Sequence, residues 1–182
     1  MSRLLLVVAP AALLGLLVLL AGCKGDSDSG EPTATRQPQA TATVDPADTP
    51  DIRSEALAEQ PGLSEFLASS GGVVDASRMS YADLTGSGAD EAIVPVSSGG
   101  EGGDIAVFVF GYGAGNEIEE LLRAIPAETS ILATIEGGQL KTTEGAYAPG
   151  DPFGFPSQLV HRYYKWDGSA LVIEREEQEP AQ

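Results

Sequence analysis

The chain contains 182 residues, and its 27 acidic and 10 basic side chains give a formal net charge of −17. Because nucleic acids and anionic lipid surfaces are bound through basic patches, this charge argues against both as partners. The only cysteine and the only histidine, Cys23 and His161, exclude an internal disulfide and a structural zinc site built from cysteine and histidine clusters.

The first 22 residues have the layout of an export signal. Arg3 supplies a positive charge, residues 4–20 form an uncharged apolar run, and two small residues precede Cys23. The segment Leu20-Ala21-Gly22-Cys23 resembles the lipobox of bacterial lipoprotein signal peptides. The resemblance implies that the signal is removed, that Cys23 carries lipid, and that the protein is anchored to a cell membrane on its extracytoplasmic side, periplasmic or at the cell surface. The alternative is an uncleaved membrane helix, because residues 4–22 are just long enough to span about 30 Å of hydrocarbon.

Residues 23–50 are predicted to form a disordered tether. They consist mainly of Gly, Ser, Asp, Thr, Ala, Gln and Pro, and Val44 is their only large apolar side chain. Such a segment buries too little apolar surface to offset its ordering entropy. We therefore expect one globular domain over residues 51–176, held clear of the membrane, and a solvated, disordered tail over residues 177–182.

Helical patterns occur at two places. Thr49-Pro50-Asp51 is typical of a helix start, and apolar residues of roughly helical spacing follow over residues 52–67. Because Pro61-Gly62 interrupts this stripe, we predict two short helices that end at Gly71-Gly72. A second helix-like stripe covers residues 117–125.

The remaining segments predict strands. Apolar or alternating patterns of the strand type cover residues 79–83, 91–96, 104–112, 129–135, 139–143, 159–166 and 170–175. Gly137-Gly138 and Asp167-Gly168 divide the last four of these into two hairpins. We therefore expect an α+β fold, with short N-terminal helices packed on a mostly antiparallel, twisted sheet of six or seven strands.

The loop from Asp83 to Glu91, with the sequence DLTGSGADE, joins two predicted strands. It resembles the calcium loops of integrin-type (FG-GAP) and VCBS repeats, in which side-chain oxygens at alternate positions bind the ion. The resemblance implies calcium ligation by Asp83, Thr85, Ser87 and Glu91. Thr85 and Ser87 stand where the family has an asparagine and an aspartate, which removes one charge from the ligand set. The alternative is a turn whose side chains bind backbone N–H groups in place of a metal.

Residues 145–156, with the sequence GAYAPGDPFGFP, form a long loop that carries Tyr147, Phe153 and Phe155. Long ordered loops in compact domains are often functional, and aromatic side chains are favoured anchors at interfaces. We therefore predict that this loop binds a protein or glycan partner in the cell envelope. The alternative is a packed lid whose rings fold back over the sheet.

Catalysis has little support in the sequence. His161 follows Asp151 and Ser157, but a triad is recognised by geometry, and the chain has no G-x-S-x-G motif. The Asp83 loop and the Lys-Trp-Asp-Gly hairpin together resemble small bacterial envelope lipoproteins without an assigned activity. We therefore predict a non-enzymatic binding or envelope-structural domain. Two alternatives stay open, namely an extracytoplasmic hydrolase with acidic residues near the Asp83 loop, and a weak calcium-dependent adhesion module.

Overall fold

The computed structural model describes residues 50–100, 102–128 and 130–181. The predicted export signal, the lipidation site Cys23 and the tether up to residue 49 lie outside the described residues. Within the described part, no helix has both the length and the apolar character needed to cross a membrane.

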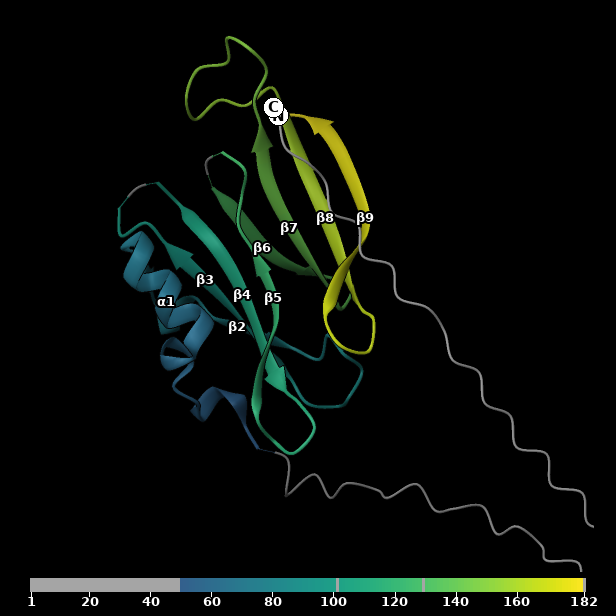
Figure 1. Cartoon of the computed structure of the whole chain (residues 1–182). Coiled ribbons are helices and arrows are strands. Elements are labelled where there is room, and N and C mark those ends of the chain that lie inside the picture. The colour runs from purple at the N-terminus through teal and green to yellow at the C-terminus, as the bar shows by residue number, and fades with distance from the viewer. Residues whose placement is uncertain (1–49, 101, 129, 182) are drawn as a thin grey trace, which may run out of the picture. The chain divides into compact units, whose positions relative to one another are not determined.

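The described residues form two antiparallel sheets (Figure 1). The first sheet has the order β1-β3-β4-β5, and β2 pairs with β3 beside β1. Its strands are β1 (Val73–Val74), β2 (Ser80–Ala82), β3 (Glu91–Ser97), β4 (Asp104–Tyr112) and β5 (Ile118–Ala124). The second sheet is a simple meander of β6 (Ile131–Glu136), β7 (Gln139–Ala146), β8 (Gln158–Trp166) and β9 (Leu171–Pro180).

Helix α1 (Pro61–Ser70) covers the face of the first sheet that points away from the second sheet (Figure 1). Leu63 is fully buried there, and the rings of Phe66 and Phe108 lie 5.4 Å apart. Three 3-10 turns flank the helix, namely η2 (Ile52–Ser54), η3 (Leu57–Glu59) and η4 (Ala76–Arg78). The helix ends as predicted at Gly71, whose φ of 70° suits a residue without a Cβ.

The start of the helix differs from the prediction. Pro61-Gly62 does not interrupt a helix but begins one, with Pro61 in the first turn, where its missing N–H costs nothing. The segment before it forms only the short turns η2 and η3, and Asp51 caps η2 by accepting a hydrogen bond from the backbone N–H of Arg53 at 3.0 Å.

The first sheet is a central layer with both faces buried. In β4, Ala106, Phe108 and Phe110 pack toward the helix, while Val107 and Val109 pack toward the second sheet. These five side chains are all at most 1% exposed. A strand buried on both faces is apolar throughout, which explains the continuous hydrophobic run that made this the clearest strand of the sequence.

The expected α+β class is wrong, because the fold is nearer all-β, with a single α-helix among the described residues. The largest error is the helix expected over residues 117–125, which form β5. The register between β4 and β5 shifts between Val109 and Phe110, so Leu121 is an extra residue in the ladder. Ile118 packs in the core under the helix and Leu121 in the core between the sheets. A strand that sends apolar side chains to both cores and carries a bulge therefore reproduced the apolar spacing of a helix.

Both predicted hairpins are confirmed, but the second one is longer than expected. Strand β9 continues to Pro180 and pairs with β8 up to Gln158. The disordered tail predicted over residues 177–182 is therefore wrong for residues 177–180. Their side chains are exposed and two of the four are acidic, so the sequence carries no apolar alternation at the place where backbone hydrogen bonds extend the strand.

Candidate functional site

Asp83 organises the first half of the loop that resembles a calcium site. Its Oδ1 accepts hydrogen bonds from the backbone N–H groups of Gly86 (2.7 Å) and Ser87 (3.1 Å), and its Oδ2 accepts one from Gly88 (3.0 Å). Gly86 and Gly88 have φ of 76° and 87°, a conformation that favours glycine and that turns these N–H groups toward the carboxylate.

Glu91 organises the second half of the same loop. Its Oε2 accepts hydrogen bonds from the backbone N–H groups of Leu84 (2.6 Å) and Thr85 (3.2 Å), and its Oε1 accepts one from the Thr85 hydroxyl (2.9 Å). The residue is only 3% exposed. This burial raises the pKa of Glu91, while the three hydrogen bonds act in the opposite direction. Gly111 on β4 makes room for it, because a Cβ there would approach Glu91 Cγ to 3.0 Å.

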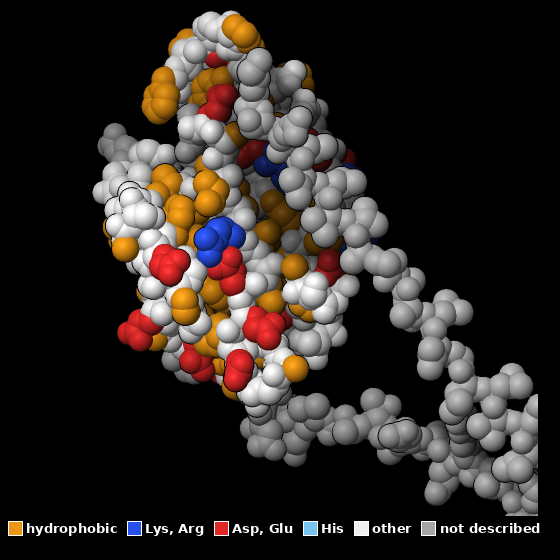
Figure 2. Space-filling view, in the orientation of Figure 1, with side chains coloured by type: hydrophobic (Ala, Val, Ile, Leu, Met, Phe, Trp, Pro, Cys, Tyr) orange, Lys and Arg blue, Asp and Glu red, His pale blue; other side chains and the backbone are white. Residues whose placement is uncertain are grey.

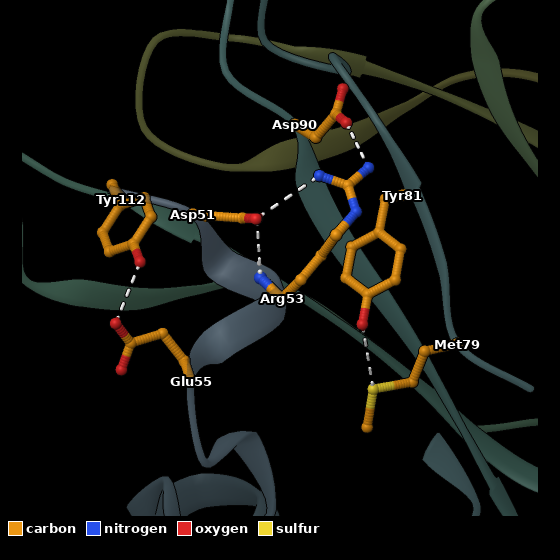
Figure 3. Close-up of polar contacts among 7 residues, drawn as sticks. All are labelled: Asp51, Arg53, Glu55, Met79, Tyr81, Asp90 and Tyr112. Atoms are coloured by element: carbon orange, nitrogen blue, oxygen red, sulfur yellow. Dashed lines mark hydrogen bonds and ion pairs between the residues drawn. The ribbon is translucent and has the colours of Figure 1, made fainter. Parts of the chain in front are cut away.

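The end of the loop is bound to the segment before the helix (Figure 3). Arg53 donates to Asp90 at 2.6 Å, and its guanidinium lies over the ring of Tyr81 at 4.5 Å. Nearby, the Tyr112 hydroxyl donates to Glu55 at 3.0 Å. Burial, followed by this bond, raises the pKa of Tyr112 to about 12. These contacts fasten the N-terminal turns of the domain to the first sheet.

The structure brings the four predicted calcium ligands into one loop, but as two separate hydrogen-bonded sets. Asp83 and Glu91 each face backbone donors, while the hydroxyl of Ser87 lies 3.2 Å from the N–H of Ala89, which donates to it. Among the described residues, no group of three or more His, Cys, Asp and Glu side chains is arranged to hold a metal. The calcium site stays a prediction.

A thermal unfolding experiment tests this calcium prediction. Because an ion that binds only the folded state stabilises it by mass action, millimolar calcium is expected to raise the melting temperature. Asp83→Asn, which removes one ligand charge, is expected to abolish the rise. An unchanged melting temperature of the original protein at millimolar calcium would contradict the prediction.

A cavity of about 520 Å³ lies at the end of the sandwich where β4 begins and β7 ends. Arg78 and Asp104 line it and form a two-pronged ion pair, with distances of 2.6 and 2.7 Å. Asp104 is only 5% exposed. Because both of its oxygens accept from one guanidinium, this pair fixes turn η4 against the start of β4.

Glu144 is the second buried carboxylate that lines the cavity. It follows Leu140 and Thr142 on the inward face of β7, and one of its oxygens, Oε1, accepts from Arg162 at 2.5 Å. Arg162 also donates to Glu176 at 2.8 Å. The other oxygen, Glu144 Oε2, is buried and has no hydrogen-bond partner. Among the described residues it is the only buried side-chain oxygen or nitrogen in this state.

The loop between β7 and β8 stands beside this cavity and is held by Asp151. The Asp151 carboxylate accepts from the backbone N–H groups of Ala148 (2.7 Å) and Ser157 (2.8 Å) and from the Ser157 hydroxyl (2.6 Å). The bond from the Ser157 hydroxyl is the main cause that lowers the pKa of Asp151. At the base of the loop, Gly145 allows close packing, since a Cβ there would meet Pro156 at 2.9 Å.

The three aromatic residues predicted to bind a partner occupy different positions in this loop. Tyr147 is half-buried and lines the cavity together with Phe153. Phe153 is 88% exposed and Phe155 is 74% exposed. Figure 2 shows hydrophobic side chains on the surface of this loop, which projects at the top of the view. The lid-like arrangement therefore does not describe Phe153 and Phe155, whose rings face solvent.

The structure does not assemble a triad. Ser157 and Asp151 are hydrogen-bonded to each other, but His161 lies on the outer face of the second sheet. There His161 Nδ1 is 2.8 Å from the Thr143 hydroxyl and Nε2 is 3.0 Å from Glu179. No acid–base–nucleophile chain connects the three residues.

Sequence reasoning missed the charged residues that line the cavity, which are Arg78, Asp104 and Glu144, and it also missed Arg162 as the partner of Glu144. Glu144 gave one usable signal, because it continues the inward alternation of Leu140 and Thr142 with an acid. Arg78 and Asp104 gave none, since 26 residues separate them and their pairing depends on the fold.

Comparison with known proteins gives one partial relationship. The chain is 32% identical over 96 residues to lipoprotein CseA of Streptomyces avermitilis. This match covers 53% of the chain and 43% of CseA, so the chain matches less than half of that relative's length. No protein-family model matches the chain. No solved structure matches it significantly.

Proposed function

We propose that this protein is a lipoprotein anchored to a cell membrane through lipid on Cys23, and that its extracytoplasmic β-sandwich is a binding module. The loop over residues 145–156 provides the binding surface, and its partner is a protein or glycan of the cell envelope. The observation that carries the binding proposal is the pair of exposed rings, Phe153 and Phe155, on a loop that Asp151 holds in place.

Two observations support the lipid anchor. The sequence Leu20-Ala21-Gly22-Cys23 follows an apolar run and a single basic residue, as in a lipoprotein signal. The similarity to a protein named as a lipoprotein agrees with this assignment. Acyl chains contribute about 0.8 kcal/mol per buried CH₂, so two or more chains hold a protein stably at a bilayer.

The loop geometry supports binding over a purely structural role. Contact between aromatic rings and water is unfavourable in the free protein. Free energy is gained when a partner covers the rings and removes them from water. The Asp151 hydrogen bonds order the loop before binding, which reduces the conformational entropy lost on association. The nearby cavity offers a recess beside the two rings for a side chain or a small group of the partner.

A hydrolase is the second candidate, because the carboxylates of Asp104 and Glu144 line the same cavity. Acid–base catalysis needs carboxyl oxygens that reach the substrate. Both oxygens of Asp104 and one oxygen of Glu144 are taken up by guanidinium groups of Arg78 and Arg162. In the Asp83 loop, Asp83 and Glu91 likewise accept from backbone N–H groups, and Asp90 accepts from Arg53. Binding is therefore the function that this geometry favours.

Photo-crosslinking in the native membrane tests the binding proposal. Phe153 and Phe155 are replaced one at a time by p-benzoylphenylalanine, which keeps an aromatic ring at the position. We expect each variant to give a discrete crosslinked product, identified by mass spectrometry as an envelope protein or glycan.

The matched control places the same crosslinker at Ala114, an exposed residue of the turn after β4. Because β4 starts at the cavity, this turn lies about 27 Å away along the strand. The Ala114 variant is expected to give no such product. If positions 153 and 155 react no more than position 114, the loop is not the binding surface.

A further inference from the structure

One carboxylate oxygen of Glu144 indicates what kind of group the cavity binds. Most buried polar atoms have a hydrogen-bond partner, because a buried polar atom without one keeps the full free-energy cost of its desolvation. Glu144 Oε2 has none, although the residue is only 7% exposed and lines the cavity. A carboxylate oxygen accepts hydrogen bonds and donates none, so the missing group is a donor.

The charge balance around Glu144 indicates what kind of donor is missing. Arg162 is one guanidinium bound by two carboxylates, Glu144 and Glu176. The charged side chains that line the cavity are Arg78, Asp104 and Glu144, and together they carry one net negative charge. Arg78 and Asp104 neutralise each other, whereas Glu144 and Glu176 share the single positive charge of Arg162, so this set of three keeps one uncompensated negative charge. A single positive charge restores the balance.

The remaining walls of the cavity favour a ligand with an apolar stem. Ile131, Leu132 and Leu159 line it with aliphatic surface, and Tyr147 and Phe153 with aromatic surface. Aromatic faces attract cations, and aliphatic walls cover methylene groups. Arg78 lines the same cavity, but both oxygens of Asp104 accept from its guanidinium, so its charge is compensated.

We infer that this cavity binds a primary ammonium group on an unbranched alkyl stem, the chemistry of a lysine side chain, with the ammonium donating to Glu144 Oε2. The inference rests on the proposed function, since it assigns the cavity beside the 145–156 loop to a lysine of the partner. The high net negative charge of the chain favours such a cationic group.

An NMR titration of the ¹⁵N-labelled full-length protein tests this inference with hexylamine, hexanol and the peptide acetyl-Gly-Lys-Gly-amide. Hexylamine is expected to shift the backbone amides of Glu144, Gly145, Tyr147 and Phe153 in a saturable manner at millimolar concentration. Hexanol has the same stem without the charge, and it is expected to bind at least about tenfold more weakly. The peptide is expected to shift the same amides.

Two substitutions of equal charge change provide the matched comparison. Glu144→Gln removes the negative charge and, because the one remaining oxygen can accept from Arg162, places an amide N–H₂ in the cavity. It is expected to weaken hexylamine binding at least about tenfold. Glu176 contacts the same guanidinium but does not line the cavity. Glu176→Gln removes the same charge, and hexylamine binding is expected to persist. If Glu144→Gln does not fold, the comparison of hexylamine with hexanol on the original protein decides.

The outcomes separate this inference from the proposed function. Absence of hexylamine binding, equal binding of hexanol, or unchanged binding in folded Glu144→Gln overturns the ammonium site. Hexylamine binding without peptide binding supports the ammonium site and overturns its assignment to a lysine. Crosslinking at position 153 without hexylamine binding leaves the proposed function standing while this inference fails. Hexylamine binding without crosslinking at positions 153 and 155 supports the ammonium site and counts against the proposed function.

Discussion

Replacing Glu91 by alanine is expected to lower the free energy of unfolding by about 2 to 4 kcal/mol. Glu91 accepts hydrogen bonds from two backbone N–H groups and one hydroxyl while it is almost fully buried. Alanine leaves the N–H groups of Leu84 and Thr85 without the carboxylate that accepts from them. Chemical denaturation measures the change, and thermal unfolding should show a melting temperature lower by about 8 to 15 °C.

Glu91→Gln is the matched control for this change. Glutamine keeps one oxygen that can accept from both backbone N–H groups, and its amide N–H₂ can donate to the Thr85 hydroxyl. We expect it to retain most of the stability. Equal destabilisation by alanine and glutamine would show that the charge of Glu91, and not its role as an acceptor for the loop, matters to folding.

The stability of the original protein is expected to depend on pH in a way that the stability of Glu91→Gln does not. Burial raises the pKa of Glu91 above its ordinary value of 4.5, so the folded state binds the proton more tightly than the unfolded state. The stability that this difference contributes is fully present below pH 4.5 and is lost as the pH rises through the raised pKa. Glu91→Gln should lack this component. If the stabilities of the two proteins change in parallel over that range, the assignment to Glu91 is wrong.

Cys23→Ala is expected to remove all lipid from the protein. The thiol is the acceptor that the lipoprotein proposal requires, and Cys23 is the only cysteine of the chain. Mass spectrometry of the protein from its native membrane should show, in the original chain, an N-terminus at Cys23 that carries acyl mass. The alanine variant should show neither the acyl mass nor this N-terminus.

Cys23→Ser serves as the control for size and polarity, since a hydroxyl replaces the thiol. It should lose the lipid as completely as the alanine variant does. An intact N-terminus with residues 1–22 still present in the original protein would contradict the lipid anchor. It would indicate instead that residues 4–22 remain as a membrane helix.

Local patterns predicted most strands of the domain. Residues 104–112 and both hairpins were correctly identified, because continuous apolar runs and Gly-containing turns report backbone conformation over a few neighbouring residues. The 145–156 loop was identified from its prolines and aromatics in the same way. The sequence alone also points to Cys23, since an export signal is read as a linear segment.

The tertiary structure decided the rest. Residues 118–124 became a strand because both faces of the first sheet are covered, one by α1 and one by the second sheet, and no local propensity reports that. The cavity depends on pairs such as Arg78 with Asp104 and Glu144 with Arg162, which lie 26 and 18 residues apart in the chain. Their distances follow from sheet register and packing between layers, so the site exists only once the sandwich has closed.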